Sequence, residues 1–213
     1  MKKFLFFTFM AFMAFTTHAW AQATTTNLSD MPEGSYKLDP THTNILFKVS
    51  HMGFSEYVGR FNEMEGTINF SPDAIGESAV QININPASID TNHEELEEKL
   101  RGEAAFDVVN FPRITFAASR IEWGADNSAI IEGNLFMLGE THPVTFDAEF
   151  NGGGVHPFSQ RYTLGFQAST VIDRTDWGFD TWIPMVGNNV EIQIHAEFNS
   201  LQTAEQPVSG IGE

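Results

Sequence analysis

Apolar and polar residues alternate along most of the chain between positions 45 and 198. The segment PVTFDAEF, residues 143–150, places valine, alanine and two phenylalanines on one parity and threonine, aspartate and glutamate on the other. Successive side chains of a strand point to opposite faces, so this period of two predicts a strand with one buried and one solvated face. The same pattern recurs in the segments 45–50, 80–85, 114–118, 131–137, 162–170 and 190–198. With residues 58–70, where the parity slips near Met64 and predicts a bulge, the chain has about eight strands.

One segment departs from this alternation. Thr91 and Glu94 fit the T-x-x-E capping box, and a run of strong helix formers follows. Leu96 and Leu100 are four positions apart and therefore share one helix face. We expect a short helix over about residues 91–101 that packs its two leucines on an end or a wall of the sheet structure. A solvated crossover between two strands explains the segment equally well.

Strands without long intervening helices predict an all-β fold, either a closed antiparallel barrel or a sandwich. The residues from Gly139 to His142, between two of the strands, are expected to form a hairpin turn. A closed eight-stranded barrel is wide enough to be filled by its own side chains or to hold one small ligand. Aromatic side chains suit both a core and an apolar cavity, so the composition leaves that choice open.

The N-terminus carries the pattern of a secretory signal peptide. Two lysines precede an apolar run from Phe4 to Phe15, and small-x-small cleavage patterns end at Ala21 and Ala23. The run is much shorter than the about 20 apolar residues that a bilayer-spanning helix needs. We therefore expect residues 1–21 to be a signal peptide that is cleaved after Ala21 or Ala23, and we expect no stable insertion into a membrane.

The remaining chain is expected to form one domain between two tails. Residues 22–33 and 201–213 are polar and lack periodicity, which predicts flexible tails, whereas residues 34–200 hold all the expected strands. The chain has no cysteine, so no disulfide can stabilise it. Loss of the two signal lysines takes the net charge from −17 to −19. Such an acidic surface repels nucleic-acid phosphates and anionic lipid headgroups, so we exclude nucleic acid as a partner.

Sequence motifs for catalysis and metal binding are missing. The chain has no G-x-S-x-G, no phosphate-binding loop and no G-x-G-x-x-G after a strand. Asp173 and Asp176 form a pair of carboxylates, but such pairs are common in polar loops. The histidines outside the signal lack metal-ligand spacing and are His42, His51, His93, His142, His156 and His195. We expect no enzyme, no catalytic residue, no metal site and no required cofactor.

Four blocks of the sequence resemble, in the same order, the YceI-like family of polyisoprenoid-binding proteins. They are LDPTHTNILFKVSHMGFSEYVGRF (38–61), IDTNHEELEEKLRGEAAFDVVNFPRITF (89–116), NLFMLGETHPVTFDAEF (134–150) and IDRTDWGFDTWIPMVGNNVEIQIHAEF (172–198). The resemblance implies a lipocalin-like, extended eight-stranded antiparallel barrel whose apolar channel holds a bound isoprenoid lipid, such as a quinone or polyprenyl compound, without catalysis. It also implies a bacterial periplasmic protein, with a homodimer as a candidate assembly.

Two positions depart from the family pattern. Relatives tend to carry an Asp-x-His-Leu motif in the helix, where this chain has Glu97-Glu98-Lys99-Leu100, so a contact made by that histidine does not transfer to Lys99. Ala105 stands where relatives have the first phenylalanine of a pair. The smaller side chain widens the space that the ring occupies, which affects the length and shape of the expected cargo.

The inward parity and the family blocks together supply candidates for the lining of the channel. On the strands these are Phe47, Val49, Phe61, Ile82, Ile84, Phe116, Leu135, Met137, Phe146, Phe166 and Ile194. On the loops, aromatic residues that can close an end are Phe54, Phe106, Phe111, Trp177 and Phe179, and the adaptable methionines Met52 and Met185 lie near them. For any single one of these residues, core packing is a simpler explanation than ligand contact, because side chains also fill small barrels.

A polar head group has three candidate partners. Arg174 can offer a fork of donors to a quinone, phenol or phosphate oxygen, although pairing with Asp173 or Asp176 is the simpler interpretation. His42 and His51 resemble family positions near a barrel mouth. Two alternatives to the isoprenoid carrier remain open, namely a binder of other amphiphiles such as fatty acids or fatty amides, and a filled barrel that serves as a structural or protein-interaction module.

Overall fold

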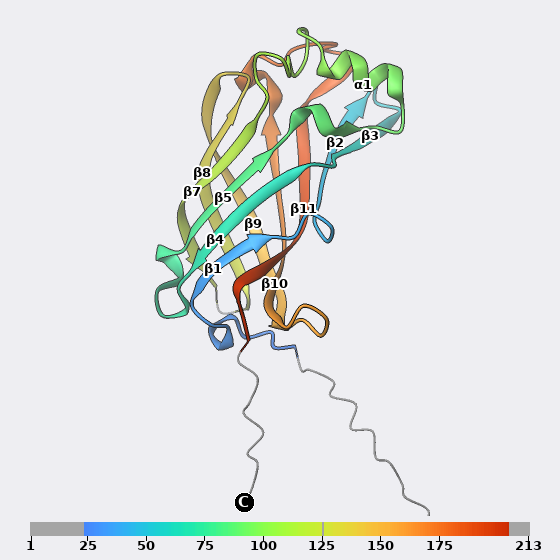
Figure 1. Cartoon of the computed structure of the whole chain (residues 1–213). Helices are drawn as coiled ribbons and strands as arrows, with labels where there is room; N and C mark the ends of the chain where they lie inside the picture. Colours follow the sequence, from blue (N-terminus) through green and yellow to red (C-terminus); the bar gives the residue numbers. More distant parts are fainter. Residues whose placement is uncertain (1–23, 125, 205–213) are drawn as a thin grey trace, which may run out of the picture.

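The computed structural model of the chain describes residues 24–124 and 126–204. The predicted signal peptide with its cleavage sites, and most of the predicted C-terminal tail, lie outside the described residues. The described part contains one eleven-stranded antiparallel sheet, one α-helix and four short 3-10 helices (Figure 1). The strands are β1 (Gly34–Leu38), β2 (Asn44–His51), β3 (Ser55–Phe61), β4 (Met64–Phe70), β5 (Ala79–Ile84), β6 (Ile89–Asp90), β7 (Ile114–Trp123), β8 (Ser128–Met137), β9 (Glu140–Val155), β10 (Arg161–Asp173) and β11 (Val186–Thr203). The helices are η1 (Leu28–Asp30), η2 (Pro72–Glu77), η3 (Pro86–Ser88), α1 (Glu94–Arg101) and η4 (Arg174–Trp177).

Eight of these strands close into an antiparallel barrel, which confirms the predicted fold. Their order around the ring is β1, β4, β5, β7, β8, β9, β10 and β11, and β11 pairs back onto β1. The closing contact is short, with Tyr36 opposite Ser200 and Leu38 opposite Phe198. Closure satisfies the backbone donors and acceptors of both edges, so the ring itself presents no free strand edge.

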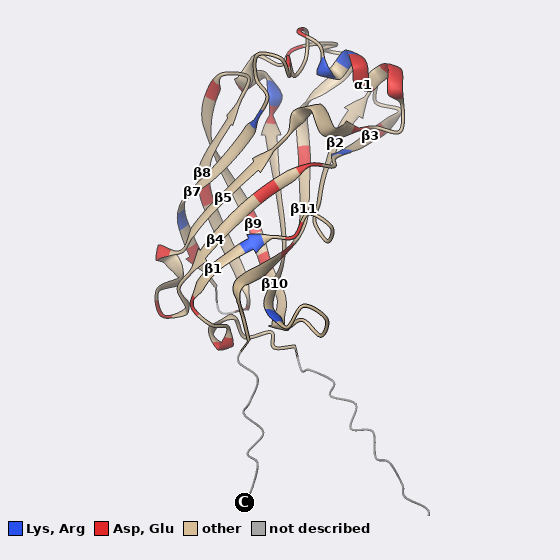
Figure 2. Cartoon of the chain, viewed as in Figure 1, with Lys and Arg blue, Asp and Glu red and all other residues tan. Residues whose placement is uncertain are grey.

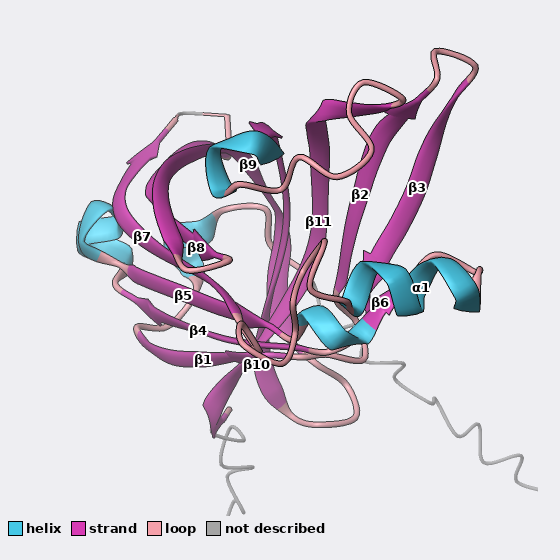
Figure 3. Ribbon diagram, turned by 90° about the horizontal axis from the view of Figure 1, so that it is seen from above, coloured by secondary structure: helices cyan, strands magenta, loops and turns pink. Residues whose placement is uncertain are grey.

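The other three strands form a wing beside the barrel, made of β2, β3 and β6. Strand β11 has 18 residues, enough to pair with two strands in turn along one edge. Its part from Val186 to His195 pairs with β2, and its part from Phe198 to Ser200 pairs with β1. Between β1 and β2 the chain turns away from the barrel through residues 39–43. Seen from above, the β2–β3 hairpin stands out to one side of the barrel, with α1 beside it (Figure 3).

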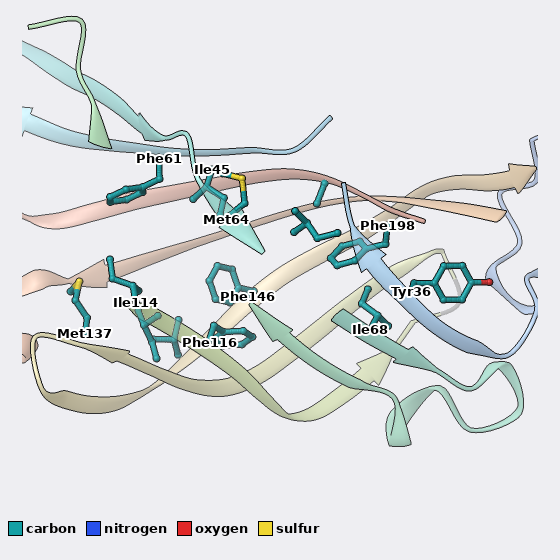
Figure 4. Packing of buried hydrophobic residues seen from close by; sticks show 14 of the residues in the cluster. Tyr36, Ile45, Phe61, Met64, Ile68, Ile114, Phe116, Met137, Phe146 and Phe198 are labelled. Carbon is teal, nitrogen blue, oxygen red and sulfur yellow. The ribbon is translucent and has the colours of Figure 1, made fainter. Parts of the chain in front are cut away.

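The inner faces of the strands follow from the alternation in the sequence. In β9, Val144, Phe146, Ala148 and Phe150 are all buried, and the residues between them are exposed. Figure 4 shows apolar side chains from opposite walls directed into one interior, among them Ile45 and Phe61 on one side and Phe116 and Phe146 on the other. Phe116 and Phe146 meet edge to face with ring centroids 5.0 Å apart, an arrangement that aromatic pairs favour.

Two local predictions on the strands were wrong in detail. The parity slip near Met64 is not a bulge, because β3 ends at Phe61 and β4 starts at Met64, so the chain passes from the wing into the barrel at this point. The hairpin turn before β9 consists of Leu138 and Gly139, with φ angles of 52° and 86°, and not of residues 139–142. Positive φ at both central residues gives the turn the twist of the strands it joins.

The helix is present, but its first turn is built differently from the predicted capping box. The N-cap is His93, whose Nδ1 accepts a hydrogen bond from the Leu96 amide at 3.1 Å. Glu97, and not Glu94, reaches back, since its carboxylate accepts from the amides of Thr91 at 2.8 Å and His93 at 3.3 Å. The predicted spacing failed because the helix begins three residues later than the sequence pattern indicated.

The N-terminal segment before β1 is packed, in contrast to the flexible tail expected for residues 22–33. Thr25 forms a backbone bridge with Gly153, and Leu28 and Met31 are each only 3% exposed. Tyr36 extends this packing, because its hydroxyl donates to the Pro32 carbonyl at 2.8 Å. The segment therefore covers the barrel end at which β11 ends (Figure 1). At the other boundary, β11 continues to Thr203, past the expected end of the domain at residue 200.

Candidate functional site

A cavity of about 480 Å³ runs through the barrel and under the wing. Its lining extends from Leu28, at the covered end, to Met52 and Met185 at the end where the β2–β3 hairpin and α1 lie (Figure 1). Nearly all of the lining is apolar. The barrel is therefore not filled by its own side chains, which is one of the two outcomes open to an eight-stranded ring.

Most of the predicted channel residues border this cavity. Those that line it are Phe47, Val49, Phe61, Ile82, Ile84, Phe106, Phe116, Leu135, Met137, Phe146, Phe166, Phe179 and Ile194. Phe61, Phe106 and Phe179 form a continuous aromatic series, with successive centroids 5.7 Å and 5.0 Å apart. This series joins the wing to the loops above the barrel.

Three predicted loop aromatics lie elsewhere. Phe54 is 86% exposed at the tip of the β2–β3 hairpin and does not border the cavity. Phe111 has its ring against Gly139 of the turn before β9 and does not border the cavity. Trp177 is buried, where its indole nitrogen donates to the Leu135 carbonyl at 3.1 Å. Position on a loop near the barrel end was therefore not enough to place a side chain in the cavity.

A row of small side chains gives part of the cavity its width. Ala129, Ala148 and Ala168 are direct cross-strand partners on β8, β9 and β10, and all three line the cavity. Their methyl groups extend little from the sheet, so this part of the wall leaves space that larger residues would occupy. The sequence signal was present, since all three alanines share the inward parity of their strands.

Arg174 borders the cavity but holds the loop between η4 and β11 together. Its guanidinium is buried and donates to the carbonyls of Gly187 at 2.9 Å, Phe179 at 2.8 Å, Thr181 at 2.9 Å and Val186 at 3.2 Å. It also lies 4.9 Å from the centre of the Phe179 ring. With four donors engaged, Arg174 is poorly placed to bind a ligand head group. Arg174 forms no salt bridge with Asp173 or Asp176, so the predicted pairing with these carboxylates is wrong. The side chain does hold the loop together, but its partners are backbone carbonyls.

Polar groups gather where the wing meets α1. His51 and Tyr57 both line the cavity, with ring centroids 6.4 Å apart. The Tyr57 hydroxyl donates to the Thr91 carbonyl at 3.4 Å, a long bond that leaves it free to turn to a closer acceptor. Thr91 is buried and borders the cavity as well. This end of the otherwise apolar cavity is the place that can bind a polar head group.

His42, the other histidine candidate, does not border the cavity. It lies in the turn between β1 and β2, where its Nδ1 is 3.0 Å from the Asp39 carboxylate and 3.9 Å from that of Glu197. Within the described residues these three side chains are the group whose atoms are close enough to hold a metal ion. The Asp39 oxygens, however, already accept from Thr41 and Asn199 as well as His42. The cluster is thus explained as a hydrogen-bonded turn at the point where β1 and β2 separate.

The His42 imidazole should titrate above its ordinary pKa. The hydrogen bond to Asp39 and the charges of Asp39 and Glu197 raise its pKa from the ordinary value of 6.5. A raised folded-state pKa stabilises the fold below the ordinary pKa, and this contribution is lost as the pH rises through the folded value. We expect Asp39→Asn to lower the His42 pKa, measured by proton NMR of the imidazole, whereas Glu140→Gln on the exposed face of β9 should not. An unchanged His42 midpoint in Asp39→Asn would contradict this assignment.

Several lining residues were not identified from the sequence. Trp123 and Trp182 both border the cavity, as do Leu96 and Leu100 of α1. The two leucines had the right spacing, so a signal existed for them. Trp123 has the opposite parity to Ile114 and Phe116, and it faces the cavity only because the pairing register of β7 shifts between Ala118 and Arg120. Trp182 lies in the loop before β11 with a φ of 66°, and no periodic pattern points to it.

No helix in the described part of the chain has the length and apolar character required to cross a bilayer.

Comparisons with known proteins agree with the geometry. Residues 36–198 match the YceI-like domain. A UPF0312 protein of Shewanella oneidensis is 34% identical over 158 residues, which cover 73% of this chain and 81% of the relative. A UPF0312 protein of Yersinia pestis is 33% identical over 164 residues, covering 76% and 84%.

Solved structures give the same fold. BcnA of Burkholderia cenocepacia aligns with a TM-score of 0.68 at 22% identity, covering 75% of this chain and 98% of that protein. A domain of Saccharophagus degradans, described as polyisoprenoid binding and implicated in plant cell wall breakdown, aligns with a TM-score of 0.58 at 14% identity, covering 78% and 98%. At these identities the likeness establishes the fold alone.

Proposed function

The chain belongs to the YceI-like domain family, and from this premise we propose that it is a non-enzymatic carrier of a long-chain isoprenoid lipid, of the quinone or polyprenyl type. The observation that carries the proposal is the unfilled apolar cavity of about 480 Å³. Apolar pockets of about 300 to 1,000 Å³ commonly hold small organic ligands. The polyisoprenoid-binding description of the Saccharophagus degradans domain supports the same ligand class.

Simple energetics favour a long ligand over a short one. Burying roughly 400 Å² of apolar surface, about the area of four isoprene units, contributes on the order of 10 kcal/mol at about 25 cal/mol per Å². Association itself costs about 4 to 15 kcal/mol. A short apolar ligand would therefore bind weakly, while a long one reaches useful affinity with few polar contacts.

The polar end of the ligand is assigned to the wing end of the cavity. His51 and Tyr57 are the exchangeable hydrogen-bonding groups there, whereas Arg174 is engaged with backbone carbonyls. A quinone or phenol oxygen can pair with either side chain. Selectivity would then reside at the head group, because the tail contacts are apolar and nonspecific.

The proposed site of action is the bacterial periplasm. This part of the proposal is supported by the basic, apolar and small-residue segments at the N-terminus, which have the order of a secretory signal. The absence of cysteine means that the fold needs no disulfide chemistry in that compartment.

Extraction and titration test the proposal together. Protein purified from a bacterium should release an apolar molecule into organic solvent, identified by mass spectrometry. After delipidation, a ubiquinone with a tail of about four isoprene units should quench the intrinsic fluorescence saturably, because Trp123 and Trp182 border the cavity. Trp182→Phe should remove part of this quenching and leave the affinity nearly unchanged.

Two outcomes would replace this proposal. Extraction of a fatty acid or fatty amide, with no uptake of the quinone, would assign the cavity to another amphiphile. No co-purified apolar molecule, together with no saturable binding of quinone or fatty acid, would leave a structural or protein-interaction role.

A further inference from the structure

Exposed apolar side chains gather beside the mouth of the cavity. The tip of the β2–β3 hairpin carries Met52 and Phe54, which are 51% and 86% exposed, and the loop before β11 carries Ile183 and Met185, at 40% and 51%. The two loops are joined, since the Met52 amide donates to the Met185 carbonyl at 2.7 Å. We call these four residues the apolar rim. Met52 and Met185 also line the cavity, so the rim is continuous with the interior.

The rim is also free of fixed charge. Residues 49–55 and 181–190 contain no Asp, Glu, Lys or Arg, although such residues make up 18% of the chain. Acidic residues are carried by α1, at Glu94, Glu95, Glu97 and Glu98 (Figure 2), but this helix lies beside the base of the β2–β3 hairpin and away from its tip (Figure 3). An uncharged apolar surface on a chain with a formal net charge of −17 is suited to a partner that is itself apolar and carries no net negative charge.

The covered end of the molecule also carries exposed apolar side chains, but these side chains do not border the cavity. Phe158, in the turn between β9 and β10, is 91% exposed, and Leu201 on β11 is 55% exposed. Neither residue borders the cavity, and that end is covered by Leu28 and Met31. Exposed apolar residues and an opening into the interior thus coincide only at the rim, among the residues that the structure describes.

We propose that the apolar rim docks on the surface of a bilayer with zwitterionic headgroups, so that an apolar ligand passes between the membrane and the cavity without crossing water. This inference rests on the proposed function and specifies where the ligand enters. Phe54 and the two methionines would insert at the boundary between headgroups and acyl chains, where exposed apolar side chains are stabilised. The net negative charge of the chain makes anionic lipid an unfavourable partner.

Vesicle flotation with matched variants tests the inference. The double variant Phe54→Ser/Ile183→Ser removes two rim side chains that do not line the cavity. Its control, Phe158→Ser/Leu201→Ser, removes a similarly exposed pair at the covered end. Two probes are used: phosphatidylcholine vesicles alone, and the same vesicles loaded with the ubiquinone of the titration above, whose transfer is followed by quenching of Trp123 and Trp182.

We expect the rim variant to lower both vesicle binding and the transfer rate about tenfold or more, since each exposed apolar side chain buried at the interface contributes about a tenfold factor. Quinone affinity measured without vesicles should stay the same, and the control pair should behave as the unchanged protein. Replacing part of the phosphatidylcholine by phosphatidylglycerol at low salt should weaken binding.

Several results would overturn the inference and leave the proposed function standing. One is quinone transfer at the original rate by the rim variant. Another is vesicle binding that depends equally on both pairs of residues. A change from dimer to monomer in the rim variant, seen by analytical ultracentrifugation, would assign the rim to a second copy of the chain. If instead neither the unchanged protein nor any variant binds quinone, but vesicle binding still depends on Phe54, the proposed function fails and the docking surface remains.

Discussion

Replacing Arg174 by leucine should lower the free energy of unfolding by about 3 to 5 kcal/mol, because it removes a buried charge that satisfies several acceptors at once. The four carbonyls that accept from the guanidinium all belong to residues 179–187, which connect η4 to β11. Burial lowers the pKa of Arg174, and the charges of Asp180 and Asp173 oppose this shift. Arginine remains protonated in any case, so these bonds persist over the usual pH range.

Urea unfolding followed by circular dichroism measures the effect. Arg113→Leu is the matched control, because Arg113 is exposed and donates no hydrogen bond to another described residue. Arg174→Lys should lose most of the same stability, since one ammonium group cannot reach carbonyls arranged around a planar fork. Equal unfolding midpoints for Arg174→Leu and Arg113→Leu would show that the staple does not hold the loop.

Replacing Ala148 by phenylalanine should weaken binding of an isoprenoid quinone about 50-fold. The new ring would occupy the space in front of the alanine row formed with Ala129 and Ala168. Excluding even three methylene-sized groups of a ligand forfeits about 2.4 kcal/mol at about 0.8 kcal/mol each, which corresponds to roughly that factor. The fold should remain, because the ring enters existing space and displaces no packed side chain.

The quenching titration described above measures this loss. Ala117→Phe places the same ring on the outer face of β7, where Ala117 is exposed, and should leave the affinity unchanged. If Ala148→Phe proves unstable in urea, Ala168→Leu takes its place. This is a smaller change in the same alanine row, and it should also weaken quinone binding. A folded variant that binds quinone with the original affinity would show that the ligand does not use this part of the cavity.

The eight-stranded count was predicted from alternation, but the strands counted were not all those of the ring. The predicted segment 45–50 became β2 of the wing, and the segment 58–70 became the end of β3 in the wing and the whole of β4 in the ring. Strand β1, with only five residues from Gly34 to Leu38, was too short to give a periodic signal. Strand β11 alternates without interruption from Val190 to Phe198, and nothing in that pattern indicates that its edge changes partner from β2 to β1. Periodicity reports burial of a face, not the identity of a neighbour.

For the candidate site, too, the sequence pattern was informative on the strands and uninformative on the loops. Inward residues on long strands, such as Phe116 and Phe146, line the cavity because the parity of a strand fixes the direction of each side chain. Loop residues have no such rule, so Phe54 and Trp177 were misplaced and Trp182 was overlooked. The role of Arg174 depended on how a loop folds back around it, which is a tertiary property.

The partner change along β11 separates two requirements that an ordinary eight-stranded ring combines. In a simple ring, strand number and stagger together fix the diameter of the barrel, so a wider interior requires a different register between all neighbouring strands. Here the hydrogen-bonded circuit closes through β1, and the β2–β3 hairpin adds chamber wall outside that circuit. Lengthening or trimming this hairpin would resize the compartment for a longer or shorter cargo while every pairing of the circuit stays in place.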